Sequence, residues 1–595
     1  YEHSGGVYTW LPYYTDSNGN IIDLDETDEI EFSAVPVDKQ EDFFLNAYPK
    51  PVARVNNIGS LPRECVNGLV VKVVNSENTD DDYYSEFKGN YGMDGKGVWE
   101  ECPEPGGTHT FNASSLPHQI VRSETTRRDA DNDVIVKFQV SPVAWRAREA
   151  GDDNTVPRPS FAPVEGKPNS GKTISNIKLF RNRFIFLSDE NVVTSRAGDF
   201  FDLWGKSALT VTADDPIDLT ASSNYASYPT DCIAINAGLL IFSPFNQFLL
   251  TTENDVFSPQ TAKIKDLSSY DYNTKSTPFY LGTNVAFLAT EQKASKFYEM
   301  SEVTTTGQPK VVEQSKIVSR SFPPNLDLVA ASKELGVVLM NDHTSFVWGY
   351  KYYSSDEQKL QGAFFKWYFP QNITFHCVMD DVYYLITKDW TDNTNHLHKI
   401  NLNEFVGQMS FMDDLYSEKY LDLSVKLTPN QGTVTVPYTG PVVVYKDGYP
   451  VKFTQDGKTV SLDETGDVYV GMKYQSSIEL PTVYVNKRSG QTQTNEWSGS
   501  LIIHRFKMQM GFHGAYKILI DRKGRDPYSV LYESTIQDGY EANESVAIEQ
   551  VERVVPVYTR NTDMTFYITS DFPTPLTIYS MKWEGDYNPK YYKNV

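Results

Sequence analysis

The clearest chemical motif in the sequence is a phosphate-loop pattern at residues 166–173, which read GKPNSGKT. In proteins that use this loop, backbone N–H groups wrap the phosphates of a nucleotide between a buried strand and the N-terminus of a helix. Here residues 159–165 contain two prolines and no hydrophobic strand, and residues 174–187 have the pattern of a strand rather than a helix. We therefore interpret the match as accidental, within a flexible linker, and predict no nucleotide or other cofactor.

Three aspartates at alternate positions, Asp129, Asp131 and Asp133, begin like a calcium-binding loop. Such a loop needs glycine at its sixth position and glutamate at its twelfth. Those two positions hold Val134 and Val140. We interpret the segment as a solvated acidic turn, and the sequence predicts no metal site.

Side chains suited to hydrolysis are present, but their spacing selects none of them. Glycosidases need paired carboxylates, and residues 195–204 faintly resemble the Asp-box of sialidases, except that Gly198 precedes Asp199. His396 and His398 face the same side of a predicted strand without an evident third metal ligand, so we interpret them as a surface pair. No G-x-S-x-G signature marks a nucleophilic serine. The sequence thus predicts no catalytic residue.

The elements around these motifs are predicted to be β-strands. Residues 179–204 have the pattern of a β-hairpin, in which Phe184 and Phe186 precede the turn residue Asp189 and Val192 follows it. Helical spacing of apolar residues with capping signals is scarce, whereas short β-rich runs broken by Gly, Pro, Asn and Asp are frequent. This pattern favours a mainly β fold.

The core of the hairpin pattern recurs along the middle of the chain. Each unit has a turn residue and a core strand, usually followed by a polar break and a second strand. Core strands are predicted at residues 182–188, 236–243, 282–288, 336–341 and 381–387, with second strands at 247–250, 296–298 and 345–350. The spacing of about 50 residues is typical of a four-stranded propeller blade. We predict a propeller of about five or six blades, and a β-sandwich with long strands is the alternative.

The flanking regions are also predicted to be β. The first 165 residues form an acidic segment rich in Gly and Pro, and the Pro-rich residues 156–168 are interpreted as a linker. From about residue 430 apolar and polar residues alternate, which predicts one or two sandwich-like domains with an exposed loop at 486–500. The predicted fold is therefore mainly β and multidomain, with an N-terminal β platform or docking segment at 1–165, a propeller at 166–428 and a C-terminal sandwich-like platform domain at 429–595.

The composition restricts the possible classes of protein. The chain has 595 residues with 54 basic and 78 acidic side chains, and its net charge of −24 argues against tight binding of nucleic acid phosphates. No apolar run approaches the roughly 18 residues of a membrane helix. The four cysteines show neither CxxC nor metal-ligand spacing, which predicts free, partly buried thiols. The chain shows no signal peptide, and because it starts at Tyr1 without an initiator methionine, we expect a longer precursor, a cleavage or further N-terminal residues.

A series of short phrases occurs in a fixed order along the chain and carries a family resemblance. They include Leu61-Pro62, Gly97-Val98-Trp99-Glu100-Glu101, Leu116-Pro117-His118-Gln119-Ile120-Val121-Arg122, Phe180-Arg181-Asn182-Arg183, Leu187-Ser188-Asp189-Glu190-Asn191-Val192-Val193, Asp214-Asp215-Pro216-Ile217-Asp218, Phe346-Val347-Trp348-Gly349-Tyr350 and Met581-Lys582-Trp583-Glu584-Gly585. In this order they resemble tail tubular protein B, the nozzle family of short-tailed, autographivirus-type double-stranded DNA phages. Leu116 departs from the family's Met, and residues 166–173 lie where the family has a shorter junction.

The resemblance implies a structural protein of the virion, assembled in the host cytoplasm and without catalytic, cofactor or metal sites. Six copies would form a tapering tube, with the C-terminal domain as its nozzle, below an adaptor ring of tail tubular protein A. Tail fibres would dock near that junction, and genomic DNA would leave through the lumen. The aromatic content of 13% suits lateral contacts between copies. The alternative is a virion-associated β-propeller that binds glycans or depolymerises polysaccharide, which would need a carboxylate pair roughly 5–10 Å apart in a groove.

Overall fold

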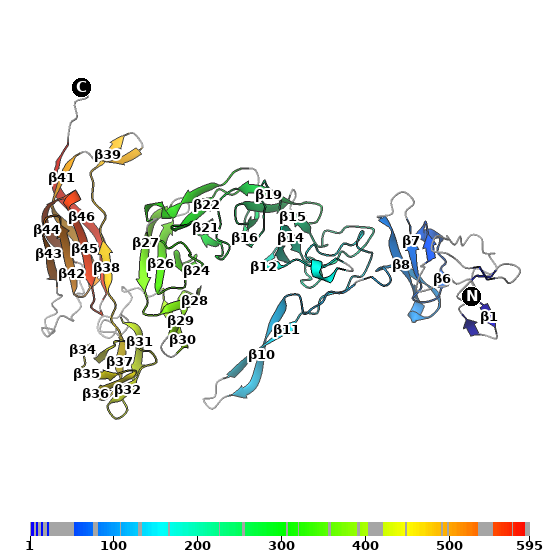
Figure 1. Ribbon diagram of the computed structural model, residues 1–595, viewed down its shortest axis with the longest axis horizontal. Helices are drawn as coiled ribbons and strands as arrows, with labels where there is room; N and C mark the ends of the chain where they lie inside the picture. Colours follow the sequence, from blue (N-terminus) through cyan, green and yellow to red (C-terminus); the bar gives the residue numbers. More distant parts are fainter. Residues whose placement is uncertain are drawn as a thin grey trace, which may run out of the picture. The chain divides into compact units, whose positions relative to one another are not determined.

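The computed structural model describes most of the chain after residue 52 (Figure 1). The described residues are 53–74, 81–107, 109–128, 134–164, 167–224, 226–252, 256–304, 307–318, 321–354, 359–389, 393–402, 421–446, 449–489, 492–496, 499–532, 551–573 and 575–589, with the short strands β1 (Glu2–Ser4), β2 (Val7–Thr9), β3 (Tyr14–Thr15) and β4 (Ile21–Ile22). The calcium-like aspartates at 129–133 and the first residue of the phosphate-loop match, Gly166, lie outside them.

Regular structure in the described residues is β-strand apart from short 3-10 turns, which confirms a mainly β, multidomain fold. The chain divides into two compact units. One comprises Tyr1–Asp342 with Tyr350–Phe364, and the other comprises His343–Gly349 with Phe365–Val595. In the part of the chain that the structure describes, no helix is long and apolar enough to cross a membrane.

The first unit begins with a five-stranded sheet and a separate hairpin. The sheet has the order β5-β7-β8-β9-β6, formed by β5 (Ala53–Val55), β7 (Val70–Val73), β8 (Tyr83–Gly89), β9 (Gly95–Cys102) and β6 (Glu64–Cys65). Its core includes the fully buried Val71 and Phe87. The hairpin pairs β10 (His118–Arg128) with β11 (Val134–Pro142) as a two-stranded sheet of its own.

Five antiparallel sheets then follow in series, each built from consecutive strands. They are β12 (Ile174–Phe180), β13 (Arg183–Ser188), β14 (Asn191–Thr194) and β15 (Asp218–Thr220); β16 (Asp231–Ile235), β17 (Gly238–Phe242), β18 (Gln247–Thr252) and β19 (Ala262–Ser268); β20 (Phe279–Leu281), β21 (Asn284–Thr290), β22 (Ser295–Ser301) and β23 (Lys310–Glu313); β24 (Leu328–Ser332), β25 (Val337–Asn341), β26 (Phe346–Ser354) and β27 (Lys359–Tyr368); and β28 (Asn372–Met379), β29 (Val382–Asp389) and β30 (Thr394–Asn401). The five core strands predicted from the sequence are confirmed as β13, β17, β21, β25 and β29, the second strand of each sheet.

Tight turns between the first two strands of these sheets use residues that tolerate a left-handed backbone. Asn182 has φ 60°, Asp381 has φ 63° and Gly336 has φ 59°. A Cβ atom at Gly336 would lie 2.4 Å from the carbonyl oxygen of Tyr352, so only glycine fits there. These three turn residues, which marked their repeats in the sequence, therefore have a structural reason.

Consecutive sheets in the first unit pack face to face. Leu187 of β13 and Ile241 of β17 belong to one buried cluster, whereas Phe242 of β17 and Phe287 of β21 belong to the next. Every residue of β17 is buried, because the sheet is covered on both faces. This serial packing is consistent with propeller blades, and the closed ring with its blade number stays a prediction.

The second unit ends in two β-sandwiches, in agreement with the expected sandwich-like region. In the first, the sheet β31 (Asp422–Leu427), β37 (Val468–Met472), β33 (Val443–Lys446) and β34 (Tyr449–Pro450) shares a core with β32 (Thr433–Thr435), β36 (Thr459–Leu462) and β35 (Phe453–Asp456). In the second, β38 (Ser476–Glu479), β45 (Met564–Ser570), β42 (Tyr516–Arg522) and β43 (Arg525–Tyr532) face β44 (Val551–Arg560), β41 (Ser500–His513) and β46 (Leu576–Asn588).

One local expectation in this region was wrong. The segment 486–500, expected to be a loop, contains the paired strands β39 (Asn486–Ser489) and β40 (Thr492–Asn495). Its residues are polar, so no apolar alternation marked the strands, although threonine favours extended backbone.

Candidate functional site

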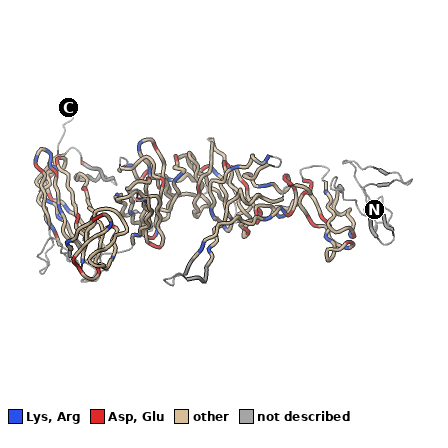
Figure 2. Tube along the Cα trace, turned by 60° about the horizontal axis from the view of Figure 1, so that its bottom comes forward, with Lys and Arg blue, Asp and Glu red and all other residues tan. Residues whose placement is uncertain are grey.

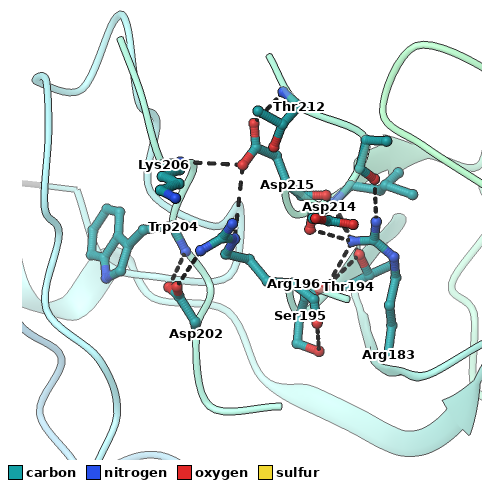
Figure 3. A network of polar contacts seen from close by, with 12 residues as sticks. Arg183, Thr194, Ser195, Arg196, Asp202, Trp204, Lys206, Thr212, Asp214 and Asp215 are labelled. Atoms are coloured by element: carbon teal, nitrogen blue, oxygen red, sulfur yellow. Dashed lines mark hydrogen bonds and ion pairs between the residues drawn. The ribbon is translucent and has the colours of Figure 1, made fainter. Parts of the chain in front are cut away.

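An extended polar cluster surrounds Arg183, the first residue of β13 (Figure 3). Its buried guanidinium donates hydrogen bonds to the carbonyl oxygens of Ala213 at 2.6 Å, Asp215 at 2.7 Å, Ser195 at 3.0 Å and Asp214 at 3.1 Å. A guanidinium carries five N–H donors in a planar fork, so one side chain can bind several carbonyl oxygens that lie outside the hydrogen bonding between strands. The cluster thus ties the long connection between β14 and β15 to the first sheet.

A second arginine, Arg196, neutralises the two buried carboxylates of this connection. Its Nη1 lies 3.4 Å from Oδ2 of Asp202, and its Nε lies 3.8 Å from Oδ1 of Asp215. Asp202 also accepts the backbone N–H of Trp204 at 3.0 Å, and Asp215 accepts that of Thr212 at 2.7 Å. Burial raises the pKa of Asp202, against the opposing effects of the Trp204 N–H and Arg196. The two carboxylates are engaged by donors within the protein, which is the arrangement of a structural cluster.

The connection helps to cover the outward face of the first sheet. Phe186 and Val193 on that face share a buried cluster with Leu203 of the connection and with Phe161 of the preceding segment. The ring of Trp204 stacks on Phe111 with centroids 4.7 Å apart. These contacts form a cap, which we define as residues 109–117, 143–164 and 195–216 around this cluster.

The cap corrects the interpretation of residues 156–168 as a linker, because the described residues 156–164 are packed against the first sheet. Val156 is 1% exposed and Phe161 is 3% exposed. The guanidinium of Arg158 donates to the carbonyl oxygen of Pro163 at 2.7 Å and pairs with Asp153. The prolines shape an irregular but packed segment, because the apolar side chains between them reach the first sheet.

The phosphate-loop match has a different local structure from a nucleotide site. A 3-10 turn, η6 (Pro168–Ser170), is followed by the strand β12, as the sequence predicted, where a phosphate loop requires a helix. The backbone N–H of Lys172 donates to the carbonyl oxygen of Phe161 at 2.9 Å, and its Nζ lies 3.6 Å from Oδ2 of Asp189. That the loop binds no nucleotide stays a prediction.

The histidine pair lies on one side of β30, as predicted. The rings of His396 and His398 are 6.2 Å apart, and each hydrogen-bonds a threonine hydroxyl, Thr394 at 3.0 Å and Thr387 at 2.8 Å. Burial and the neighbouring His396 lower the pKa of His398 to about 4. Among the residues described, no group of three or more His, Cys, Asp or Glu is arranged to hold a metal ion.

All four cysteines lie in described residues and are free thiols, as predicted. Cys65, Cys102 and Cys232 are buried, whereas Cys377 is half-buried. Burial raises the pKa of the Cys65 thiol to about 11 and that of Cys232 to about 12, so these two are poor nucleophiles.

The sequence assigned no role to Arg183, which lies in a family phrase, or to Arg196, which lies in the segment 195–204. A signal was available for Arg183, because it alternates with Ile185 and Leu187 and so points to the same side as the apolar core. An arginine in that position must find acceptors inside the protein. Its acceptors come mainly from residues about 30 positions later, which the local pattern does not show.

Comparison with known proteins finds similarity along almost the whole chain. Residues 8–594 match the family model described as bacteriophage nozzle protein. The chain is also similar to the tail tubular protein gp12 of Escherichia phage T7, with 23% identity over 92% of this chain and 70% of that protein.

Similarity to solved structures is weak. The WD40 domain of SCAP from fission yeast gives a TM-score of 0.25 with 12% identity, covering 58% of this chain and 86% of that one. An exo-beta-1,3-galactanase from Phanerochaete chrysosporium gives a TM-score of 0.19 with 10% identity, covering 80% of this chain and 99% of that one. With TM-scores this low, we infer neither fold nor activity from these two structures.

Proposed function

The chain belongs to the bacteriophage nozzle protein family, and from this premise we propose that six copies form the tubular nozzle of a short phage tail. The tube joins an adaptor ring of tail tubular protein A, helps to dock tail fibres and conducts genomic DNA during ejection. The observation that carries the proposal is the family match over residues 8–594, because it includes the N-terminal sheet, the serial sheets and both sandwiches.

The role is structural rather than enzymatic. In the cluster around Arg183, the guanidinium of that residue holds the backbone of the connection between β14 and β15, and Asp202 and Asp215 both interact with Arg196. A carbohydrate-cleaving site needs one carboxylic acid and one carboxylate facing an open groove. The cluster around Arg183 instead explains how a long connection between two strands is held in place.

The charge of the chain suits a conduit for DNA. Six copies together carry −144, six times the −24 of one chain. Figure 2 shows Lys and Arg interspersed with Asp and Glu along the described residues. A net acidic lumen repels duplex DNA near contact, since screening limits the repulsion to about 8 Å at physiological salt. DNA can then pass without being held.

A mobility-shift assay with the purified full chain and a random-sequence duplex tests the conduit. Near physiological salt we expect binding no tighter than the nonspecific range of about 10⁻⁴ M. A basic DNA-binding protein on the same gel provides the positive control. Submicromolar binding by the nozzle chain would contradict an acidic, non-adhesive lumen.

A further inference from the structure

The hairpin β10–β11 has an exposed apolar face. Ile120 pairs with Val140 and Arg122 pairs with Phe138, so these four side chains share one face of the ribbon. Ile120 is 69% exposed, Phe138 is 67% exposed and Val140 is 65% exposed. The opposite face is mainly polar, and one of its pairs is Val121 with Gln139.

Apolar contacts anchor the ribbon at its base. Trp145, just after β11, packs on Phe186 of the first sheet with ring centroids 6.1 Å apart, and Leu116, just before β10, joins the same cluster. Figures 1 and 2 both show the ribbon leaving the rest of the first unit. An isolated two-stranded ribbon is at best marginally stable in water, and an apolar sheet face normally packs on another layer. The exposed face therefore indicates a missing layer.

The second unit has an exposed apolar sheet face that could supply this layer. In the sheet β28–β30 the register places Phe375, Ile386 and Leu397 in one row, Cys377, Tyr384 and Lys399 in the next, and Met379, Val382 and Asn401 in a third, all on one face. Phe375 is 51% exposed, Met379 is 56% exposed and Leu397 is 69% exposed.

The two ends of the series of sheets therefore differ. The opposite face of β28–β30 is buried along β28 and β29 and half-buried along β30, and Tyr383 on that face lies against Trp367 of β27. The described chain continues from Asp422 into a sandwich with its own core. The outward face of the first sheet is covered by the cap. The exposed face of β28–β30 is thus available to a partner, whereas that of the first sheet is occupied.

We propose that the apolar face of β10–β11 in one copy docks on the exposed face of β28–β30 in the next copy. This inference rests on the proposed tube, and it names the surfaces that join its subunits. Two different patches on identical chains make a head-to-tail contact, which is the kind that closes into a ring. A ribbon of about eight residue pairs offers roughly 250 Å², against about 800 Å² per partner in a standard interface, so the contact is one part of a larger lateral interface.

A native thiol makes the contact directly testable. Cys377 lies within the acceptor face, and the other three cysteines are buried. Tails are assembled from equal amounts of light and nitrogen-15-labelled Phe138→Cys chains and oxidised with copper phenanthroline. Mass spectrometry of the peptides should find position 138 joined to Cys377, with about half of the links between a light and a heavy chain. Val121→Cys, on the opposite face of the same ribbon, is the matched control and should give at least tenfold fewer links.

Charge substitutions give an independent readout. Phe138→Asp should lower the yield of assembled tubes at least tenfold, whereas Gln139→Asp, with the same charge change on the opposite face, should leave it within twofold. Equal yields from the two variants would overturn the inference. Intact rings without 138–377 links, or with links only inside one chain, would overturn it and leave the proposed function standing. Tails that contain no ring of this chain would contradict both.

Discussion

Replacing Arg183 by methionine tests the structural role of the polar cluster in Figure 3 most sharply. The substitution removes a donor from four carbonyl oxygens, now bonded at 2.6–3.1 Å, of which those of Ser195 and Asp214 keep a second donor, the Thr194 hydroxyl and the Ala197 N–H. Hydrogen bonds from a charged donor contribute about 1.5–3 kcal/mol each, but methionine does not carry the desolvation cost of a buried guanidinium, which offsets part of that sum. We estimate a net loss of about 3–4 kcal/mol, in line with about 1–3 kcal/mol for each buried acceptor that loses its donor.

The loss should appear as local opening rather than global unfolding, because the carbonyls regain water once the connection leaves the sheet. Hydrogen exchange of peptides from residues 195–216 should speed up about 100- to 1000-fold, the equivalent of the estimated energy. Arg181→Met is the control, since Arg181 is exposed and lies only two residues away. Arg183→Lys keeps the charge but loses the planar fork, so it should give an intermediate effect. Unchanged exchange in the Arg183→Met variant would refute the reasoning.

Two further predictions concern single side chains. Burial raises the pKa of Asp422 to about 6 from 3.8, so the folded state binds this proton more tightly than the unfolded state, and the associated stability is lost as the pH rises from about 4 to about 6. The free energy of unfolding of Asp422→Asn should therefore match that of the parent chain near pH 4 and exceed it by about 1–2 kcal/mol at pH 7, after allowance for partial exposure. Urea unfolding at both pH values checks this, and equal stabilities at pH 7 would contradict it. For the phosphate-loop match, calorimetry with ATP and magnesium should detect no binding, and micromolar affinity that Lys172→Ala abolishes would show that prediction to be wrong.

The repeated strands could be predicted because their signal is local. Each core strand is a short apolar run preceded by a turn residue such as Asn182 or Gly336, and the left-handed φ at those residues explains the match. The sequence also indicated the alternation that builds the two C-terminal sandwiches. In both cases the residues that decide the structure are neighbours in sequence.

Long-range contacts account for what the sequence did not reveal. Phe161 looked like part of a proline-rich linker, because its partner Phe186 lies 25 positions later. The carbonyl partners of Arg183 come mainly from residues 213–215. The face shared by Ile120 and Phe138 depends on hairpin register, which the sequence of β10 alone does not set. Local patterns thus predicted the strands but not the contacts that hold the connections between them.

The copy number of this chain in the assembled tail tests the central claim most directly. Cryo-electron microscopy of purified tails should show one ring of six copies around a continuous lumen with a net acidic wall. Both sandwiches and the serial sheets should be visible in every copy. A copy number other than six, or a lumen lined mainly by Lys and Arg, would contradict the account.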